Sequence, residues 1–323
     1  MFWRKKQAQP PAVACFGKLP ATGDFIRLNA STDEFTAFDE WVASSVALAR
    51  ESLAAGWEAA YRPAAGLFIY RGPEAKGDEP DRGLIGAWVA SRDSAGRNYP
   101  MAVCGSYDFE QMLATGAALP IALWPFLKSA YELAIAGATL GVDDFLGRVA
   151  QIQPPSLDNP DGCRAAYAQW LQHQQMGALW ETCFGGTASR FGVIHDLQAS
   201  VEIFRGQERP ETHLAIRFPL GAGDAYAAAV WMDMTVRLAG WERTLLNAFW
   251  TPQRHMLVHM GPPHAATFRE LIAPSAEADH VTDLSRQRTE DDATLRERLG
   301  PKLAELTDKL DTRIDRFLQS LAG

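Results

Sequence analysis

The sequence predicts an α/β protein with a mixed β-sheet and helices on both faces, like an α/β/α sandwich, followed by a second α/β half and a C-terminal helix. Three observations support this fold class. Short apolar runs typical of strands alternate with segments of helical periodicity. A stretch rich in proline and glycine, residues 153–162, separates two such series. The last segment, residues 289–321, is strongly charged but carries one apolar stripe.

The composition is that of a soluble globular protein and argues against several classes of partner. Of the 323 residues, 47 % are apolar and 22 % are charged. The net charge of -8 and the pI of about 5.4 disfavour binding to nucleic acid or to an anionic membrane. No uncharged apolar run reaches the roughly 18 residues of a membrane span, and no signal peptide is visible at the start. We therefore expect a cytoplasmic protein without direct membrane insertion.

The first strand is expected at residues 12–16, and the loop after it carries the first candidate site. Gly17 ends the apolar run, and the loop that follows mixes proline with glycine and brings Lys18, Asp24 and Arg27 close together beside Phe25. One interpretation is an internal ion pair that pins the loop to the sheet. A phosphate-binding Walker loop does not fit, because Lys18 comes too early and no serine or threonine follows it.

A helix and two strands are expected next. Residues 31–34 read as a capping box, and apolar residues then follow at steps of three and four up to Leu53. Residues 66–71 and 84–91 have the composition of strands, and the polar stretch 72–83 between them is expected to be an exposed, mobile loop.

A third strand at residues 100–105 follows a turn that holds the second candidate site residue, Arg97. Because the two loops should flank neighbouring strands, we expect a salt bridge between Asp24 and Arg97. If the loops instead contact a partner, Lys18 and Arg27 should remain exposed. Helices are expected at residues 120–135 and 142–152.

The chain is predicted to divide into an N-terminal α/β domain, residues 12–153, and a C-terminal α/β region, residues 163–323. Whether the second half forms its own unit or extends the first sheet stays open. The apolar stripe of the last helix is expected to pack on the protein itself, with partner binding as the alternative. The elements expected in this half are helices at 164–179, 224–238, 265–272 and 289–321, and strands near 190–204, 213–218 and 255–260.

No reactive constellation is apparent. His255 and His259 share a strand face, but the general base and a well-spaced third ligand are missing, so we expect no metal there. The four cysteines lack metal or disulfide spacing, and Cys15 and Cys104 should be core thiols. The sequence contains no nucleophile elbow and no dinucleotide fingerprint. We expect no cofactor and no enzymatic activity.

Several short motifs, read together, resemble a known family. The segments Gly17-Lys18-Leu19-Pro20, Gly23-Asp24-Phe25, Phe38-Asp39-Glu40-Trp41-Val42 and Gly96-Arg97-Asn98-Tyr99-Pro100-Met101-Ala102-Val103 resemble the motifs of the TagF family, which is associated with the type VI secretion system. The resemblance covers roughly residues 13–150. It departs from the family pattern at Tyr99, which replaces phenylalanine, and at Met101, which replaces leucine. The second half is less diagnostic.

The resemblance implies a bacterial cytoplasmic α/β protein without enzymatic activity. Such a protein represses the secretion apparatus after translation, and it works with a forkhead-associated-domain scaffold protein opposite a kinase and phosphatase pair. The alternative hypothesis is a metal- or nucleotide-dependent enzyme that uses Lys18, Asp24, Arg27 and Arg97. The partner-binding or motif residues are Gly17, Lys18, Leu19, Pro20, Gly23, Asp24, Phe25, Arg27, Gly96, Arg97, Tyr99 and Pro100.

Overall fold

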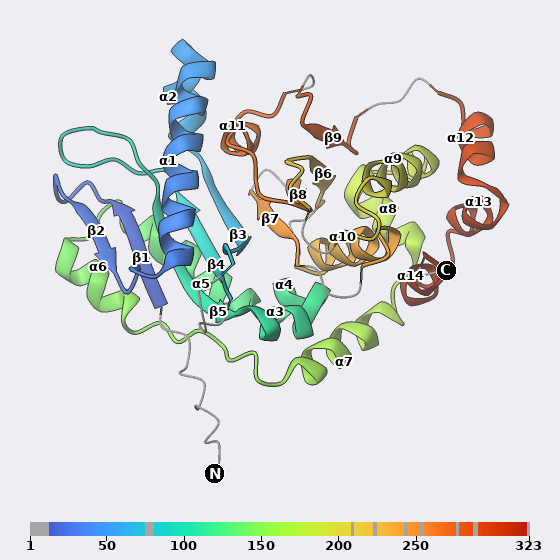
Figure 1. The fold of residues 1–323 in the computed structure, drawn as a ribbon, viewed down its shortest axis with the longest axis horizontal. Coiled ribbons are helices and arrows are strands. Elements are labelled where there is room, and N and C mark those ends of the chain that lie inside the picture. The colour runs from blue at the N-terminus through green and yellow to red at the C-terminus, as the bar shows by residue number, and fades with distance from the viewer. Residues whose placement is uncertain are drawn as a thin grey trace, which may run out of the picture.

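The strands of both halves form one continuous sheet in the computed structural model, which describes residues 13–74, 81–207, 210–221, 225–241, 245–251, 255–275, 278–286 and 290–321. The strands are β1 Val13–Lys18, β2 Phe25–Leu28, β3 Ala65–Arg71, β4 Arg82–Val89, β5 Met101–Asp108, β6 Ala215–Pro219, β7 Asn247–Trp250, β8 His255–His259 and β9 Val281–Asp283. Their spatial order is β2-β1-β5-β4-β3-β7-β8-β6-β9 (Figure 1).

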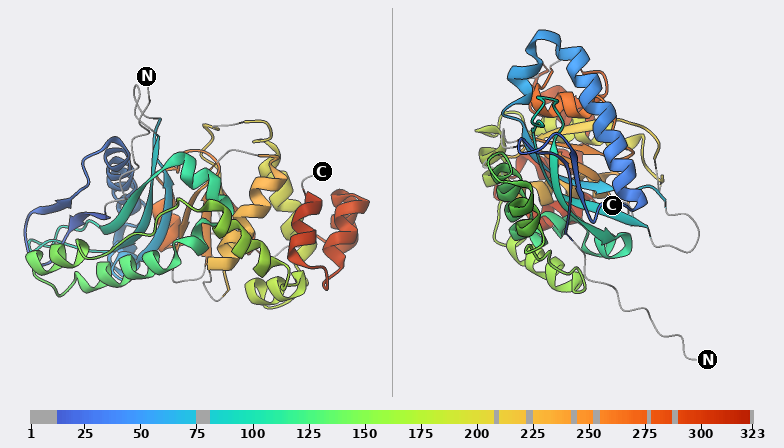
Figure 2. Two further views of the ribbon diagram at one scale, coloured as in Figure 1. Left: turned by 90° about the horizontal axis from the view of Figure 1, so that it is seen from below. Right: turned by 90° about the vertical axis from the view of Figure 1, so that its left-hand side faces the viewer.

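Helices cover both faces of this sheet, as Figure 2 shows. In the first half the helices are α1 Asp33–Leu53, α2 Trp57–Tyr61, α3 Phe109–Thr115, α4 Leu119–Ala122, α5 Trp124–Ala136 and α6 Val142–Val149. In the second half they are α7 Pro160–Leu171, α8 Met176–Phe184, α9 Arg190–Glu202, α10 Ala225–Leu238, α11 Thr267–Ile272, α12 Asp292–Leu299, α13 Pro301–Asp308 and α14 Ile314–Leu321. Short 3-10 turns lie at Ala54–Gly56 and Gly116–Ala118.

The two halves meet where β3 pairs antiparallel with β7, through the register Leu67↔Trp250, Phe68↔Phe249 and Ile69↔Ala248. The pairs of the first half are antiparallel, whereas β6 and β9 run parallel, so the sheet is mixed. The predicted fold class is therefore confirmed. Of the two arrangements left open, the second half extends the same sheet. Whether residues 12–153 and 163–323 are separate domains in the sense of independent folding stays a prediction.

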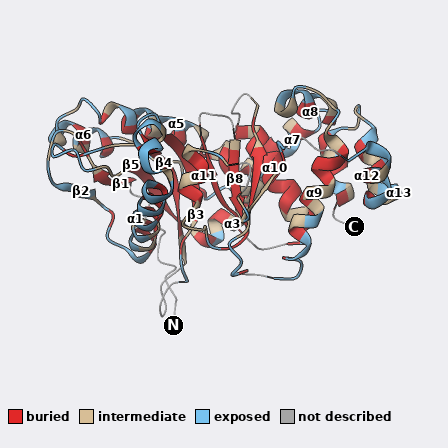
Figure 3. Ribbon diagram, turned by 90° about the horizontal axis from the view of Figure 1, so that it is seen from above, coloured by how far each residue is buried: buried red, intermediate tan, exposed pale blue. Residues whose placement is uncertain are grey.

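Each face of the sheet has its own apolar core. On one face, α1, α2 and α11 cover aromatic side chains of the strands, and the rings of Phe38 and Phe68 stack with their centroids 4.5 Å apart. On the other face, α3 to α6 and the remaining helices of the second half form a larger core. Figure 3 shows the buried residues concentrated in the sheet and in α10. Cys15 and Cys104 are fully buried, as predicted, and burial raises the pKa of Cys15 to about 12.

Three local predictions are wrong. Residues 190–204 contain helix α9, not a strand; because consecutive residues 191–194 are all buried, the apolar pattern has no helical period to recognise. Residues 164–179 form two helices, α7 and the start of α8, rather than one. The capping box is absent, because α1 begins after Thr32 without a side-chain cap. The carboxylate of Glu34 is buried and accepts a hydrogen bond from the Ser106 hydroxyl instead.

The C-terminal stripe packs on the protein itself. Ile314, Phe317 and Leu321 are buried, and Leu303, Leu306 and Leu310 pack against the larger core. The expected helix is divided into α12, α13 and α14, with the first break at Gly300. Of the polar stretch 72–83, residues 75–80 lie outside the described residues.

The length and apolarity of a helix decide whether it can span a membrane. Within the described ranges no single helix combines the length and the apolarity needed to cross a bilayer. The segments Phe109–Ala122 and Trp124–Ala136 reach that threshold only when taken together, and they are bent by 62°.

Candidate functional site

The two motif loops lie against each other beside the end of β1. One loop joins β1 to β2, and the other joins β4 to β5. The backbone N–H of Ser94 donates to the carbonyl of Thr22 at 2.9 Å, and the hydroxyl of Ser91 donates to the carbonyl of Lys18 at 2.7 Å. Main-chain and side-chain hydrogen bonds therefore fix the relative position of loops that are about 70 residues apart.

The carboxylate of Asp93 is the centre of this arrangement. Its side chain is inaccessible to solvent and accepts hydrogen bonds from Lys18 Nζ at 2.7 Å and from Arg97 Nε at 2.6 Å. The backbone N–H groups of Ala95 and Arg97 also donate to it, at 3.0 and 2.8 Å. The hydrogen bond from Lys18 is the largest of several causes that lower the pKa of Asp93, while desolvation opposes them. Asp93 is thus held as a carboxylate that closes the turn.

The expected salt bridge between Asp24 and Arg97 is wrong. Arg97 binds Asp93, four residues earlier in the same turn, and its Nη2 donates to the carbonyl of Gly23 at 2.7 Å. Asp24 is exposed, and its backbone N–H donates to the hydroxyl of Thr22. Arg97 pairs with Asp93 because both residues belong to the same turn, whereas Asp24 lies on a different segment of the chain.

Gly17 is required by the close approach of the second loop. Its φ of +134° is unfavourable for other residues, and a Cβ at this position would lie 2.0 Å from the carbonyl oxygen of Pro100. Leu19 is fully buried directly after Lys18 and anchors the loop in the core. The Gly-Lys-Leu-Pro motif therefore has a structural explanation at three of its four positions.

Exposed residues of the two loops and of the adjoining strand β2 form a second feature, which we call the motif patch: Asp24, Phe25, Arg27 and Arg97. Phe25 is 38 % exposed and packs edge-on against Tyr99, with ring centroids 5.2 Å apart. Arg27 lies 5.7 Å from the centre of the Phe25 ring and pairs with Asp39 at 2.7 Å. Tyr99 donates a hydrogen bond to the Asp39 carboxylate, and burial together with this contact raises the pKa of Tyr99.

The predicted site residues therefore divide into two groups. The side chain of Lys18 is only 14 % exposed, whereas those of Arg27 and Arg97 are 44 % and 64 % exposed. The buried or partly buried group, which ties the loops together, consists of Gly17, Lys18, Leu19, Pro20, Tyr99 and Pro100. The exposed group consists of Gly23, Asp24, Phe25, Arg27, Gly96 and Arg97. The second group presents more of its surface to a partner than the first.

His255 and His259 do not form an open site. His259 is fully buried, and its Nε2 lies 3.0 Å from the Thr267 hydroxyl. Desolvation lowers the pKa of His259 to about 3 and that of His255 to about 4. Among the residues that the structure describes, no group of three or more histidine, cysteine or acidic side chains is arranged to hold a metal ion.

Comparison with known families supports the resemblance read from the motifs. The family model of the TagF N-terminal domain, described as type VI secretion system-associated, matches residues 14–152. This part of the chain is a TagF N-terminal domain. A search among curated proteins found no match. The structure is similar to the crystal structure of PA0076 from Pseudomonas aeruginosa PAO1, with 16 % identity and a TM-score of 0.46, over 83 % of this chain and 96 % of that chain.

The TagF N-terminal domain contains both motif loops and every residue of the motif patch. Strand β3 of this domain pairs with β7 of the second half. The sheet therefore continues beyond the part of the chain that the family model matches. Sequence reasoning missed Asp93, which the family motifs as quoted do not include. The sequence did contain a signal for Asp93: it begins a turn that ends in Gly96, and an aspartate at such a position commonly accepts hydrogen bonds from the backbone of the turn.

Proposed function

We propose that this type VI secretion-associated chain is a non-enzymatic regulator that represses the secretion system after translation. It acts in the bacterial cytoplasm through protein–protein interaction, and its partner is a forkhead-associated-domain scaffold protein. The observation that carries the proposal is the TagF N-terminal domain at residues 14–152. No cofactor or metal takes part in this activity.

The geometry of the motif loops supports an interaction surface better than a catalytic centre. The ammonium of Lys18 is neutralised by Asp93 and largely covered, so it is poorly placed to bind a phosphate. What remains at the surface is one aromatic ring, Phe25, with the guanidinium group of Arg27 beside it, and the exposed guanidinium group of Arg97 on the second loop. Aromatic residues and arginine contribute most to binding energy at protein interfaces. We therefore assign the contact with the scaffold to the motif patch.

Purified scaffold and purified full-length protein test this assignment by titration calorimetry. Phe25→Ala and Arg27→Ala should each weaken binding by about tenfold, as expected for residues at the centre of an interface. The matched controls are Ile203→Ala, which removes another exposed apolar side chain, and Arg316→Ala, which removes an exposed arginine in α14. Both controls should bind like the wild type.

Secretion in cells supplies the second measurement. Loss of the protein should increase secretion, and a Phe25→Ala/Arg27→Ala variant that is folded and normally abundant should fail to restore repression. If wild-type protein and scaffold do not bind, the proposed partner is wrong. If they bind and the patch variants bind equally well, the partner stands and the motif patch is not the contact surface.

A further inference from the structure

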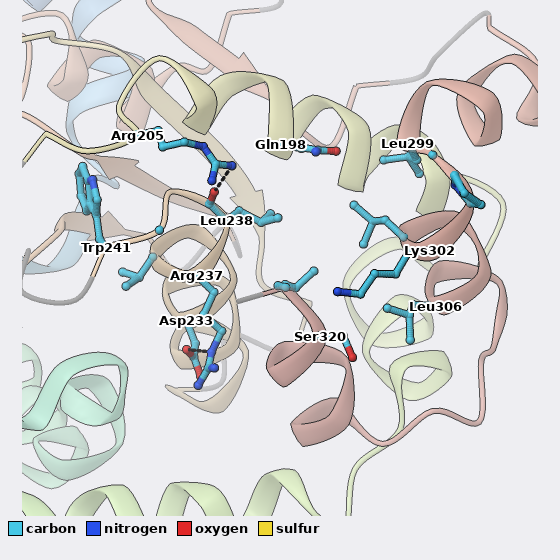
Figure 4. Close-up of a pocket in the computed structure, with 16 residues that line it drawn as sticks. Gln198, Arg205, Asp233, Arg237, Leu238, Trp241, Leu299, Lys302, Leu306 and Ser320 are labelled. Atoms are coloured by element: carbon cyan, nitrogen blue, oxygen red, sulfur yellow. Dashed lines mark hydrogen bonds and ion pairs between the residues drawn. The ribbon is translucent and has the colours of Figure 1, made fainter. Parts of the chain in front are cut away.

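A cavity of about 780 Å³ lies in the second half, outside the TagF N-terminal domain. It opens between α9 and α10 on one side and α12, α13 and α14 on the other (Figure 4). This volume falls in the range of small-molecule sites, roughly 300–1,000 Å³. The apolar part of its wall is formed mainly by Leu238, Trp241, Leu299, Leu303, Leu306 and Leu321.

The charged groups of the wall are mostly cationic, although the whole protein carries a net charge of -8. Arg237 Nε lies 2.6 Å from Asp233, which is the one carboxylate among the described lining residues. Arg205 is bound to Glu202 at 3.0 Å and donates to the carbonyl of Leu238. The two arginines are thus already neutralised by carboxylates.

Lys302 differs from both arginines. It is exposed and forms no ion pair with any residue that the structure describes. Figure 4 shows its side chain extending from α13 into the cavity, opposite α10. Lys302 also lies in the first turn of α13, where the helix dipole adds positive potential. An ammonium without a carboxylate partner among the described residues therefore projects into a space whose walls combine leucine side chains with polar and charged groups.

We propose that this cavity binds a small organic anion with an apolar body. Its carboxylate, sulfonate or phosphate group pairs with Lys302, and the amide of Gln198 offers a further polar contact at the wall. The apolar body lies against Leu238, Trp241 and Leu306. A purely apolar ligand would leave the ammonium without a partner, and a hydrophilic anion would leave the leucines in contact with water.

The fluorescent anion 8-anilinonaphthalene-1-sulfonate tests the site on the full-length protein, because it joins a sulfonate to an aromatic body. It should bind saturably at one site. Lys302→Ala should weaken this binding by about tenfold, as expected when a charge-assisted hydrogen bond is lost, and Lys302→Arg should largely preserve it. The matched control is Lys128→Ala, which removes an exposed lysine on α5 of the first half.

Two further measurements complete the test: displacement of the probe by competing ligands, and substitution of a lining residue by a larger one. Decanoate should displace the probe at a concentration at least about tenfold lower than decanol, since only decanoate can pair with Lys302. Leu306→Trp should occupy the part of the cavity beside Lys302 and weaken probe binding while Lys302 is intact; if this variant melts early, Ser320→Phe on α14 takes its place. Probe binding that is unchanged in Lys302→Ala, equal competition by decanol, or full binding to the folded filled variant would each overturn the proposal.

Discussion

Lys18 Nζ lies 2.7 Å from Asp93 Oδ2 and thereby joins two residues that are 75 positions apart in the chain. The pair connects the end of β1 to the turn between β4 and β5, and Arg97 shares the same carboxylate. Of the two interpretations of the Lys18 loop, this geometry favours the internal ion pair, with Asp93 rather than Asp24 as the partner. Lys18 therefore holds the two loops together, and the exposed side chains of Phe25 and Arg27 are the ones available to contact a partner.

The first prediction concerns Lys18→Glu. Because the new carboxylate would face the inaccessible carboxylate of Asp93, we expect the melting temperature to fall by several degrees. Circular dichroism melting of the purified variant measures this. Lys128→Glu is the control, since its side chain is 67 % exposed and its change should have little effect. A Lys18→Glu variant that melts like the wild type would show that the pair with Asp93 contributes nothing.

The second prediction compares two glycines with positive φ in the motif loops. Gly17→Ala should severely destabilise the protein, because its Cβ would collide with the Pro100 carbonyl at 2.0 Å. Gly96 has a φ of +82° but open space around it, so Gly96→Ala should cost only the backbone strain, about 1–2 kcal/mol. Urea unfolding of both variants measures the difference. Equal losses in the two variants would mean that the β1 loop moves away from Pro100 without difficulty.

The sequence predicts the fold class because strand and helix signals are strong in the longer elements. Helix α1 has apolar residues at regular steps, and Phe35, Phe38 and Val42 are indeed buried. The short strands β2 and β9 give no such signal, because three or four residues do not establish a period and their strand state depends on pairing with β1 and β6.

The site is predictable to a lesser degree. The motif residues could be found by their resemblance to the TagF family, but whether each one is buried depends on how the two loops meet. Lys18 and Arg27 look equivalent in the sequence, yet only Lys18 finds a covered carboxylate. The cavity near Lys302 could not be predicted, because its wall combines residues from Gln198 to Leu321 that only the packing of five helices brings together.

The third prediction concerns acid stability. Desolvation holds the pKa of His259 near 3 and that of His255 near 4, below the ordinary value of 6.5. Below pH 6.5 the unfolded chain therefore binds protons that the folded chain does not, so stability is full above pH 6.5 and decreases as the pH falls toward 4. His259→Gln should reduce this slope by up to about 1.4 kcal/mol per pH unit relative to the wild type.

Urea unfolding at pH 7, 6 and 5 measures this slope for both proteins. The difference between variant and wild type isolates the histidine, because the carboxylates titrate in both. His259→Gln should lower stability at pH 7, since the contact with Thr267 is disturbed, and the loss should shrink as the pH falls. A loss that is constant from pH 7 to pH 5 would contradict the assignment of a neutral, desolvated His259.

The fourth prediction concerns Arg217, a buried arginine in β6. Its guanidinium lies 2.5 Å from Glu270 of α11 and 2.7 Å from Asp283 of β9, and the Arg217 and Glu270 side chains are only 4 % and 2 % exposed. The pair connects β6, the strand next to the edge of the sheet, to a helix on its face. Because Arg217→Met leaves Glu270 buried without this partner, we expect it to lower the free energy of unfolding by roughly 3–5 kcal/mol.

A double-mutant cycle separates the ion pair from the packing of the long side chain. Glu270→Met alone should also destabilise, because it leaves Asp283 as the carboxylate partner of Arg217, beside the Ser275 carbonyl. The double variant Arg217→Met/Glu270→Met should lose less than the sum of the single losses, by about 0.5–3 kcal/mol, since no buried charge of this pair is left behind. Arg62→Met, which breaks an exposed pair with Glu58, should cost no more than about 1 kcal/mol. Strict additivity in the cycle would show that Arg217 acts through its aliphatic stem, its contact with Asp283 and its hydrogen bond to the Ser275 carbonyl, and that Glu270 is held by Arg269 and the backbone N–H of Ser275.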